Sequence, residues 1–130
     1  MTHVPVAVVQ AEVEPTLQGG LVRTRDLAIE AAASGARLVV FPETWIPGYP
    51  AWLDVCRDAA LWNHPPVKQV FRRMAENSVV VAGESGRALG EIARDAKVTL
   101  VIGVSERVEQ GPGRGTLYNS LLTYGPDGTL

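Results

Sequence analysis

Two short runs of β-branched apolar residues, separated by one helical pattern, constrain this chain more than any other feature of its sequence. Residues 4–12 (VPVAVVQAE) and 36–41 (ARLVVF) are typical of buried strands. Residues 21–34 follow a helical pattern, with the pair Gly19-Gly20 expected in the preceding turn and Gly35 in a left-handed stop. A strand, a helix and a strand within about 40 residues predict a βαβ unit with parallel strands.

The rest of the chain continues the alternation of helices and strands. Residues 42–64 are rich in proline and glycine and predict an irregular or short-helical segment. We expect helices over 65–78 and 86–96, strands over 98–106 and 116–124, and a tight turn over 125–128. No linker or repeat divides residues 1–130, which predicts one α/β layer architecture with strands buried on both faces. The last turn opens a hairpin without a second strand, so we expect the natural chain to continue beyond Leu130.

Composition and charge argue against several classes of function. Hydrophobic residues make up 46% of the sequence and charged residues 20%, as in globular proteins. The net charge is −2 without a basic stripe, which predicts no nucleic-acid partner. No charged leader or long apolar run is present, so we expect no membrane association and a cytoplasmic location. The single cysteine and two histidines show no metal-ligand spacing, and no glycine fingerprint follows the first strand, so no metal and no cofactor are expected.

The candidate functional residue is Glu43, which follows the second strand in the segment VVFPETWIPGYPAW (39–52). In parallel α/β sheets, ligands bind outside the carboxyl ends of the strands. The rings of Phe41, Trp45 and Tyr49 are expected to exclude water around the carboxylate and make it a better general base. Position alone leaves open a structural role, in which Glu43 caps the next helix or pairs with an arginine.

The other reactive side chains point to structural roles. Cys56 is the only thiol, has no activating neighbour in the sequence, and is expected to be a small buried packing residue. The segment GPGRG (111–115) lacks the lysine and hydroxyl of a phosphate-binding loop. Lys68 and Lys97 lie in the helical patterns and are assigned no catalytic role.

Four stretches together resemble the nitrilase branch of the carbon–nitrogen hydrolase superfamily. They are GARLVVFPETWIPGYPAW (35–52), VPVAVVQAE (4–12), AKVTLVIGVSER (96–107) and GTLYNSLLTYGPDG (115–128). The resemblance implies that residues 1–130 form the amino-terminal part of a single domain. It implies an αββα sandwich, of which this chain supplies roughly the first half. It also implies a small-molecule nitrile or amide substrate and a homo-oligomeric assembly, and the GYP continuation favours nitrile-acting members over amidases.

The same resemblance implies that Glu43 is the general base of a Glu-Lys-Cys triad. The family's lysine and nucleophilic cysteine would lie beyond Leu130, and neither Cys56 nor the lysines of this chain match their contexts, so we expect the chain alone to be inactive. Tyr49 is the aromatic residue expected to face substrate, with packing of the turn as the alternative. Two other hypotheses are a nitrilase-like fragment that binds or assembles without catalysis, and an unrelated doubly wound α/β binding domain.

Overall fold

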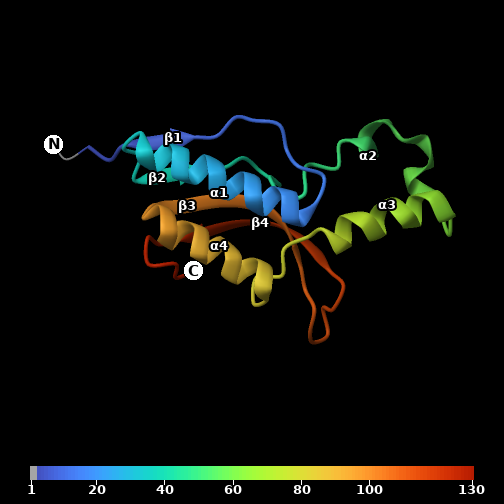
Figure 1. Ribbon diagram of the computed structural model, residues 1–130. Helices are drawn as coiled ribbons and strands as arrows, with labels where there is room; N and C mark the ends of the chain where they lie inside the picture. The colour runs from blue at the N-terminus through green and yellow to red at the C-terminus, as the bar shows by residue number, and fades with distance from the viewer. Residues whose placement is uncertain (1–2) are drawn as a thin grey trace.

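The computed structural model describes residues 3–130 (Figure 1). Its elements, in chain order, are β1 (Val6–Val8), α1 (Leu17–Ala33), β2 (Leu38–Val40), α2 (Trp52–Val55), the 3₁₀ helix η1 (Arg57–Ala60), α3 (Pro65–Glu76), α4 (Glu84–Ala96), β3 (Thr99–Arg107) and β4 (Leu117–Tyr124). The predicted order of helices and strands is confirmed. The first two strands are shorter than the apolar runs that predicted them.

Within the described residues, the four strands form one sheet in the order β1-β2-β3-β4. β1 pairs with β2, and β2 with β3, in parallel, while β3 and β4 form an antiparallel hairpin around the loop at 111–115. The parallel pairing of the first two strands confirms the predicted βαβ unit. Their carboxyl ends therefore meet at one edge of the sheet, where the segment containing Glu43 begins.

The start of α1 differs from the prediction. Thr16 is the N-cap residue, and its hydroxyl oxygen accepts a hydrogen bond from the backbone N–H of Gly19 (3.1 Å), so the glycine pair lies inside the helix. A Cβ added to Gly20 would lie 3.0 Å from Cγ1 of Ile46, so this glycine is a point of close packing and not part of a turn. Gly35, with φ +93°, ends the helix as predicted.

Helices α1 and α4 cover one face of the sheet (Figure 1). The core between these two layers contains apolar side chains from both helices and from all four strands. Its buried helix residues are Ala28, Leu89, Ile92 and Ala93, and its buried strand residues are Val39, Leu100, Ile102, Val104, Leu122 and Tyr124. Residues 3–130 thus form one helix layer and one sheet layer.

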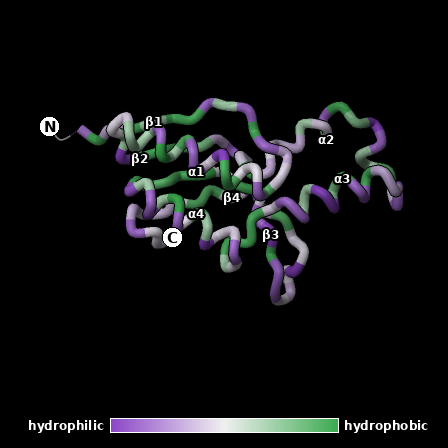
Figure 2. Tube along the Cα trace, in the orientation of Figure 1, coloured by the Kyte–Doolittle hydropathy of each residue, from purple (hydrophilic) through white to green (hydrophobic). Residues whose placement is uncertain are grey.

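No helix within residues 3–130 covers the opposite face, here named the open sheet face. The strand register and the alternation of side chains place Val8, Val40, Val101 and Leu121 on this face. Val8 is 76% exposed and Leu121 is 68% exposed, and Figure 2 shows hydrophobic residues along these strands. The prediction that the strands are buried on both faces is therefore wrong for this chain. Apolar residues occupy both faces, but the helices cover only one.

The segment from α2 to α3 extends away from the sheet (Figure 1). α3 begins at Pro65, as predicted, because a proline in the first turn removes an N–H that has no helical partner. The ring of Trp52 in α2 packs edge-on against Phe71 in α3, with centroids 5.2 Å apart. This contact holds the irregular segment after Glu43 against the helix that follows it.

Candidate active site

Glu43 lies in a tight turn directly after β2. The backbone N–H of Trp45 donates to the carbonyl of Pro42 (3.3 Å), which closes the turn. Thr44 has φ 46°, in the left-handed region that β-branched residues rarely adopt. Such strain costs of order 1–3 kcal/mol and is concentrated at functional sites. The surrounding structure therefore holds this turn in a conformation that Thr44 itself disfavours.

The aromatic neighbours of Glu43 point away from it, into the core. Phe41 and Trp45 are 1% and 0% exposed, with ring centroids 5.2 Å apart, and Nε1 of Trp45 donates to Oγ1 of Thr24 in α1 (2.8 Å). Glu43 itself is exposed. The prediction that these rings form a dry shell around the carboxylate is wrong for this chain. The turn sends the rings to the helix side of the sheet and the carboxylate to the other side.

The backbone of Glu43 rests on a glycine of β3. A Cβ added to Gly103 would lie 2.4 Å from the carbonyl oxygen of Pro42 and 2.6 Å from Cα of Glu43, closer than real Cβ atoms approach. Gly103 pairs with Leu121 and lies two residues from Val101 on the open sheet face. The turn after β2 therefore crosses this face, and Glu43 occupies it.

The carboxylate of Glu43 is held by Asn119 of β4. Nδ2 of Asn119 donates to Oε1 of Glu43 across 2.5 Å. Within residues 3–130, Glu43 forms no ion pair. The next helix, α2, has Ala51 at its N-cap position, so Glu43 does not cap it. Both structural roles that the sequence left open are therefore absent from the described part of the chain.

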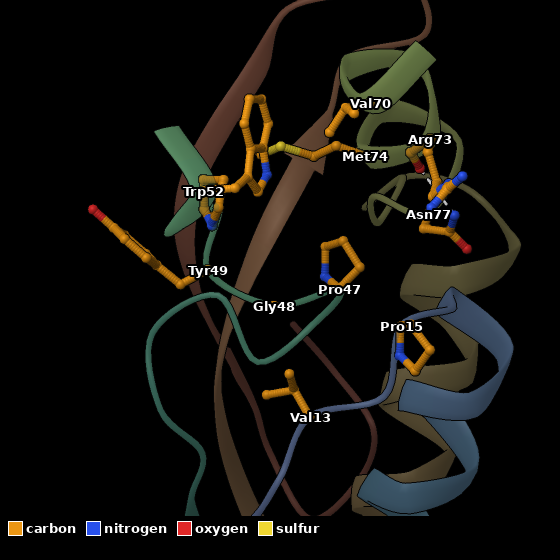
Figure 3. A pocket seen from close by; sticks show the side chains of 11 residues that line it. Val13, Pro15, Pro47, Gly48, Tyr49, Trp52, Val70, Arg73, Met74 and Asn77 are labelled. Atoms are coloured by element: carbon orange, nitrogen blue, oxygen red, sulfur yellow. Dashed lines mark hydrogen bonds between the residues drawn. The ribbon is translucent and has the colours of Figure 1, made fainter. Parts of the chain in front are cut away.

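Tyr49 lies at a separate cavity of about 330 Å³ (Figure 3). The cavity is lined by Val13, Pro15, Pro47, Gly48, Tyr49, Pro50, Trp52, Val70, Arg73, Met74 and Asn77. Figure 3 shows the ring of Tyr49 directed away from the other lining side chains, and the residue is 61% exposed. Glu43 does not line this cavity, so the described residues do not bring Tyr49 and the carboxylate together in one pocket.

The other reactive groups lie apart from this carboxylate. Cys56 is exposed at the end of α2, so the prediction of a buried packing residue is wrong. Its segment extends away from the sheet and does not enter the core. Lys68 donates to Oδ1 of Asn63 within the same outlying segment, and Lys97 is the left-handed C-cap of α4. Among the described residues, no group of histidine, cysteine, aspartate or glutamate side chains could hold a metal ion.

Nearly the whole chain matches one known protein family. The match is to the family described as carbon-nitrogen hydrolase, over residues 5–130. This chain belongs to the carbon–nitrogen hydrolase family. An arylacetonitrilase from Aspergillus kawachii (strain NBRC 4308) is 36% identical over 130 residues, which cover 99% of this chain and 36% of the relative. A cyanide hydratase from Gibberella zeae is 38% identical over 114 residues, which cover 88% of this chain and 29% of the relative.

The relatives place this family member in the nitrilase branch, as the sequence predicted, although the chain spans only 29–36% of their length. A solved structure of the amidase from Nesterenkonia sp. AN1, in complex with acrylamide, superposes with a TM-score of 0.56. It is 23% identical to this chain and covers 98% of it, while this chain covers 40% of the amidase, so the likeness shows the fold. The prediction that residues 1–130 supply part of a nitrilase-like fold is confirmed. No helix in the described part of the chain is long and apolar enough to cross a membrane.

Sequence reasoning missed three residues that place Glu43: Thr44, Gly103 and Asn119. Glycine and asparagine are both depleted in strands, so Gly103 within β3 and Asn119 within β4 were visible exceptions. A glycine inside a strand often marks a close backbone approach, which is what Gly103 provides. The partner of Asn119 was not visible, because the two hydrogen-bonded residues are 76 positions apart.

Proposed function

We propose that this chain contributes the general base, Glu43, to a nitrilase-type hydrolase. The complete enzyme would convert a nitrile to a carboxylic acid and ammonia through a Glu-Lys-Cys triad, with the lysine and cysteine supplied by residues outside this chain. The observation that best supports the proposal is the placement of Glu43. Its carboxylate follows a parallel strand, lies on the open sheet face, and has no cation paired with it among the described residues.

In the proposed reaction, the carboxylate of Glu43 accepts the proton of the cysteine thiol. The resulting thiolate attacks the nitrile carbon, and the nitrogen takes up a proton to give a thioimidate. Addition of water and loss of ammonia leave a thioester, which a second water hydrolyses to the acid and the free thiol. The lysine ammonium stabilises the negative charge that develops at the reacting centre. Glu43 is the proton acceptor in the first of these steps.

A nitrile is the substrate class that the relatives favour, because two of them are named as an arylacetonitrilase and a cyanide hydratase. We further propose that Tyr49 contacts substrate in the complete protein, which the exposure of its ring supports. The alternative is that Tyr49 packs against parts of the protein outside this chain. Homo-oligomeric assembly, a cytoplasmic location and inactivity of the isolated chain stay predictions.

The test is the substitution Glu43→Gln in a full-length protein that contains this chain. Loss of the general base is expected to lower ammonia release from an arylacetonitrile by about 10²–10⁴-fold, since glutamine keeps the size but cannot accept the proton. Glu12→Gln is the matched control, because Glu12 is another exposed glutamate and lies outside the turn after β2. Unchanged ammonia release from Glu43→Gln would remove Glu43 from the reaction.

A second candidate function is a non-catalytic nitrilase-like module that assembles with other chains. The exposed apolar residues of the open sheet face favour it, because they would be covered by assembly. Assays of the unsubstituted full-length protein for ammonia release and for complex formation distinguish the two functions. Ammonia release from a nitrile supports the hydrolase, whereas stable complex formation without turnover of nitriles or amides supports the module.

A further inference from the structure

The hydrogen bond between Glu43 and Asn119 joins two residues that are 76 positions apart in the sequence. β4 presents Asn119 opposite Ser105 of β3, on the same face as Leu121. The turn after β2 brings Glu43 to this face by crossing Gly103. The hydrogen bond from Nδ2 of Asn119 to Oε1 of Glu43 therefore connects the turn after β2 to β4, across β3.

The charge of the group that donates to Glu43 affects how well its carboxylate accepts a proton. A lysine or arginine in this position would form an ion pair that strongly favours the ionised carboxylate and weakens it as a proton acceptor. The amide of Asn119 fixes the carboxylate through one neutral N–H group. It occupies Oε1 and leaves Oε2 of Glu43 without a partner among the described residues. One oxygen is thus anchored and the other is available to accept a proton.

The backbone of Glu43 is fixed as well. Gly103 allows the chain to approach β3 closely, and the left-handed Thr44 directs the following residues back into the core. The carboxylate is consequently held at both ends, by its backbone on β3 and by its head group on β4. Holding a reacting group in one geometry is a large part of enzymatic rate acceleration.

We propose that Asn119 is a positioning residue that holds the carboxylate of Glu43 through Oε1 and presents Oε2 to the thiol. This inference rests on the proposed function of Glu43 as the general base. In this role Asn119 acts through Glu43, the side chain to which it donates its hydrogen bond.

The experiment compares Asn119→Ala, Asn119→Asp and Glu43→Gln in a full-length protein that contains this chain, with an arylacetonitrile as the assayed substrate. Asn119→Ala is expected to lower kcat by about 10–100-fold, the range for loss of one hydrogen bond to a charged group, with KM changed less than about twofold. Thr123→Ala is the matched control, because Thr123 is exposed on β4 and faces the same side of the sheet. Its kcat is expected to stay at the unsubstituted value.

The pH dependence of the activity of Asn119→Asp distinguishes a positioning role from a purely structural one. When ionised, the introduced carboxyl group cannot donate to Glu43 and repels it, but when protonated it can donate. The activity of Asn119→Asp relative to the unsubstituted protein is therefore expected to rise as the pH falls. A constant ratio across the pH range would overturn the positioning role.

The outcomes separate this inference from the function on which it rests. If Glu43→Gln leaves kcat unchanged, the proposed general base fails and the positioning role fails with it. If Glu43→Gln abolishes turnover while Asn119→Ala keeps full kcat, the base stands and the positioning role is overturned. Should Asn119→Ala fail to fold in the full-length protein, Asn119→Asp still tests the positioning role, because aspartate keeps the size of asparagine and its activity ratio is followed against pH.

Discussion

The hydroxyl of Tyr124, at the end of β4, is buried without a hydrogen-bond partner among the described residues. Burial raises the pKa of this hydroxyl above its usual range, and the carboxylate of Glu106 adds to the rise. The unfolded chain therefore releases this proton at a lower pH than the folded chain. The corresponding contribution to the free energy of unfolding is fully present below pH ~10 and is lost as the pH rises through the raised pKa.

Replacing Tyr124 with phenylalanine is expected to stabilise the protein. The substitution removes a buried hydroxyl that gives up its hydrogen bonds to water on folding, so the free energy of unfolding is expected to rise by about 1 kcal/mol at neutral pH. Tyr124→Phe should also retain more of its stability above pH ~10. Urea denaturation at both pH values checks this, with Tyr118→Phe as control because Tyr118 is 54% exposed. An equal loss of the free energy of unfolding above pH ~10 in Tyr124→Phe and in the unsubstituted chain would contradict this role of the Tyr124 hydroxyl.

At the scale of elements, Gly103 sets the distance between β3 and the turn after β2. Gly103→Ala would place a methyl group against the carbonyl of Pro42 and Cα of Glu43, so the turn must move. Overpacking of this kind costs about 1–3 kcal/mol of stability. A displacement of about 1 Å at a reacting group can lower turnover by about 10²-fold. Thermal denaturation of the chain and ammonia release by the full-length protein measure the two effects. Gly113→Ala is the control, since its added Cβ meets only ordinary contacts, and equal behaviour of the two variants would contradict the role of Gly103.

The elements whose signals are local were predictable from the sequence, and those that depend on packing were not. Strand periodicity, the proline at the start of α3 and the glycine after α1 gave the order of elements and the βαβ unit. The start of α1 was missed because glycine is typical of turns, and the close packing of Ile46 against Gly20 is not visible in the sequence. Glu43 was found from its place after a strand. The predicted direction of the neighbouring rings was wrong, because their direction depends on the left-handed turn at Thr44.

At the scale of the whole molecule, residues 3–130 form a helix layer on a sheet whose second face carries no helix. The apolar side chains of that face, with Val8 76%, Leu121 68% and Val6 52% exposed, form a surface that water solvates poorly. Continuous apolar strands of this kind are typical of sheets covered on both faces. The same surface carries Glu43 and Asn119, so a structure that covered it would also enclose the carboxylate.

The isolated 130-residue chain is therefore expected to self-associate through the open sheet face. Burial of apolar area is worth about 25 cal/mol per Å², so pairing of two such faces is favourable. Leu121→Lys is expected to shift the chain toward monomer in sedimentation velocity, because a charge at this position would have to be desolvated on association. Val22→Lys is the control, since Val22 is 50% exposed but lies on α1, on the other side of the sheet. A compact monomer at all protein concentrations, or equal effects of the two substitutions, would show that this face does not drive association.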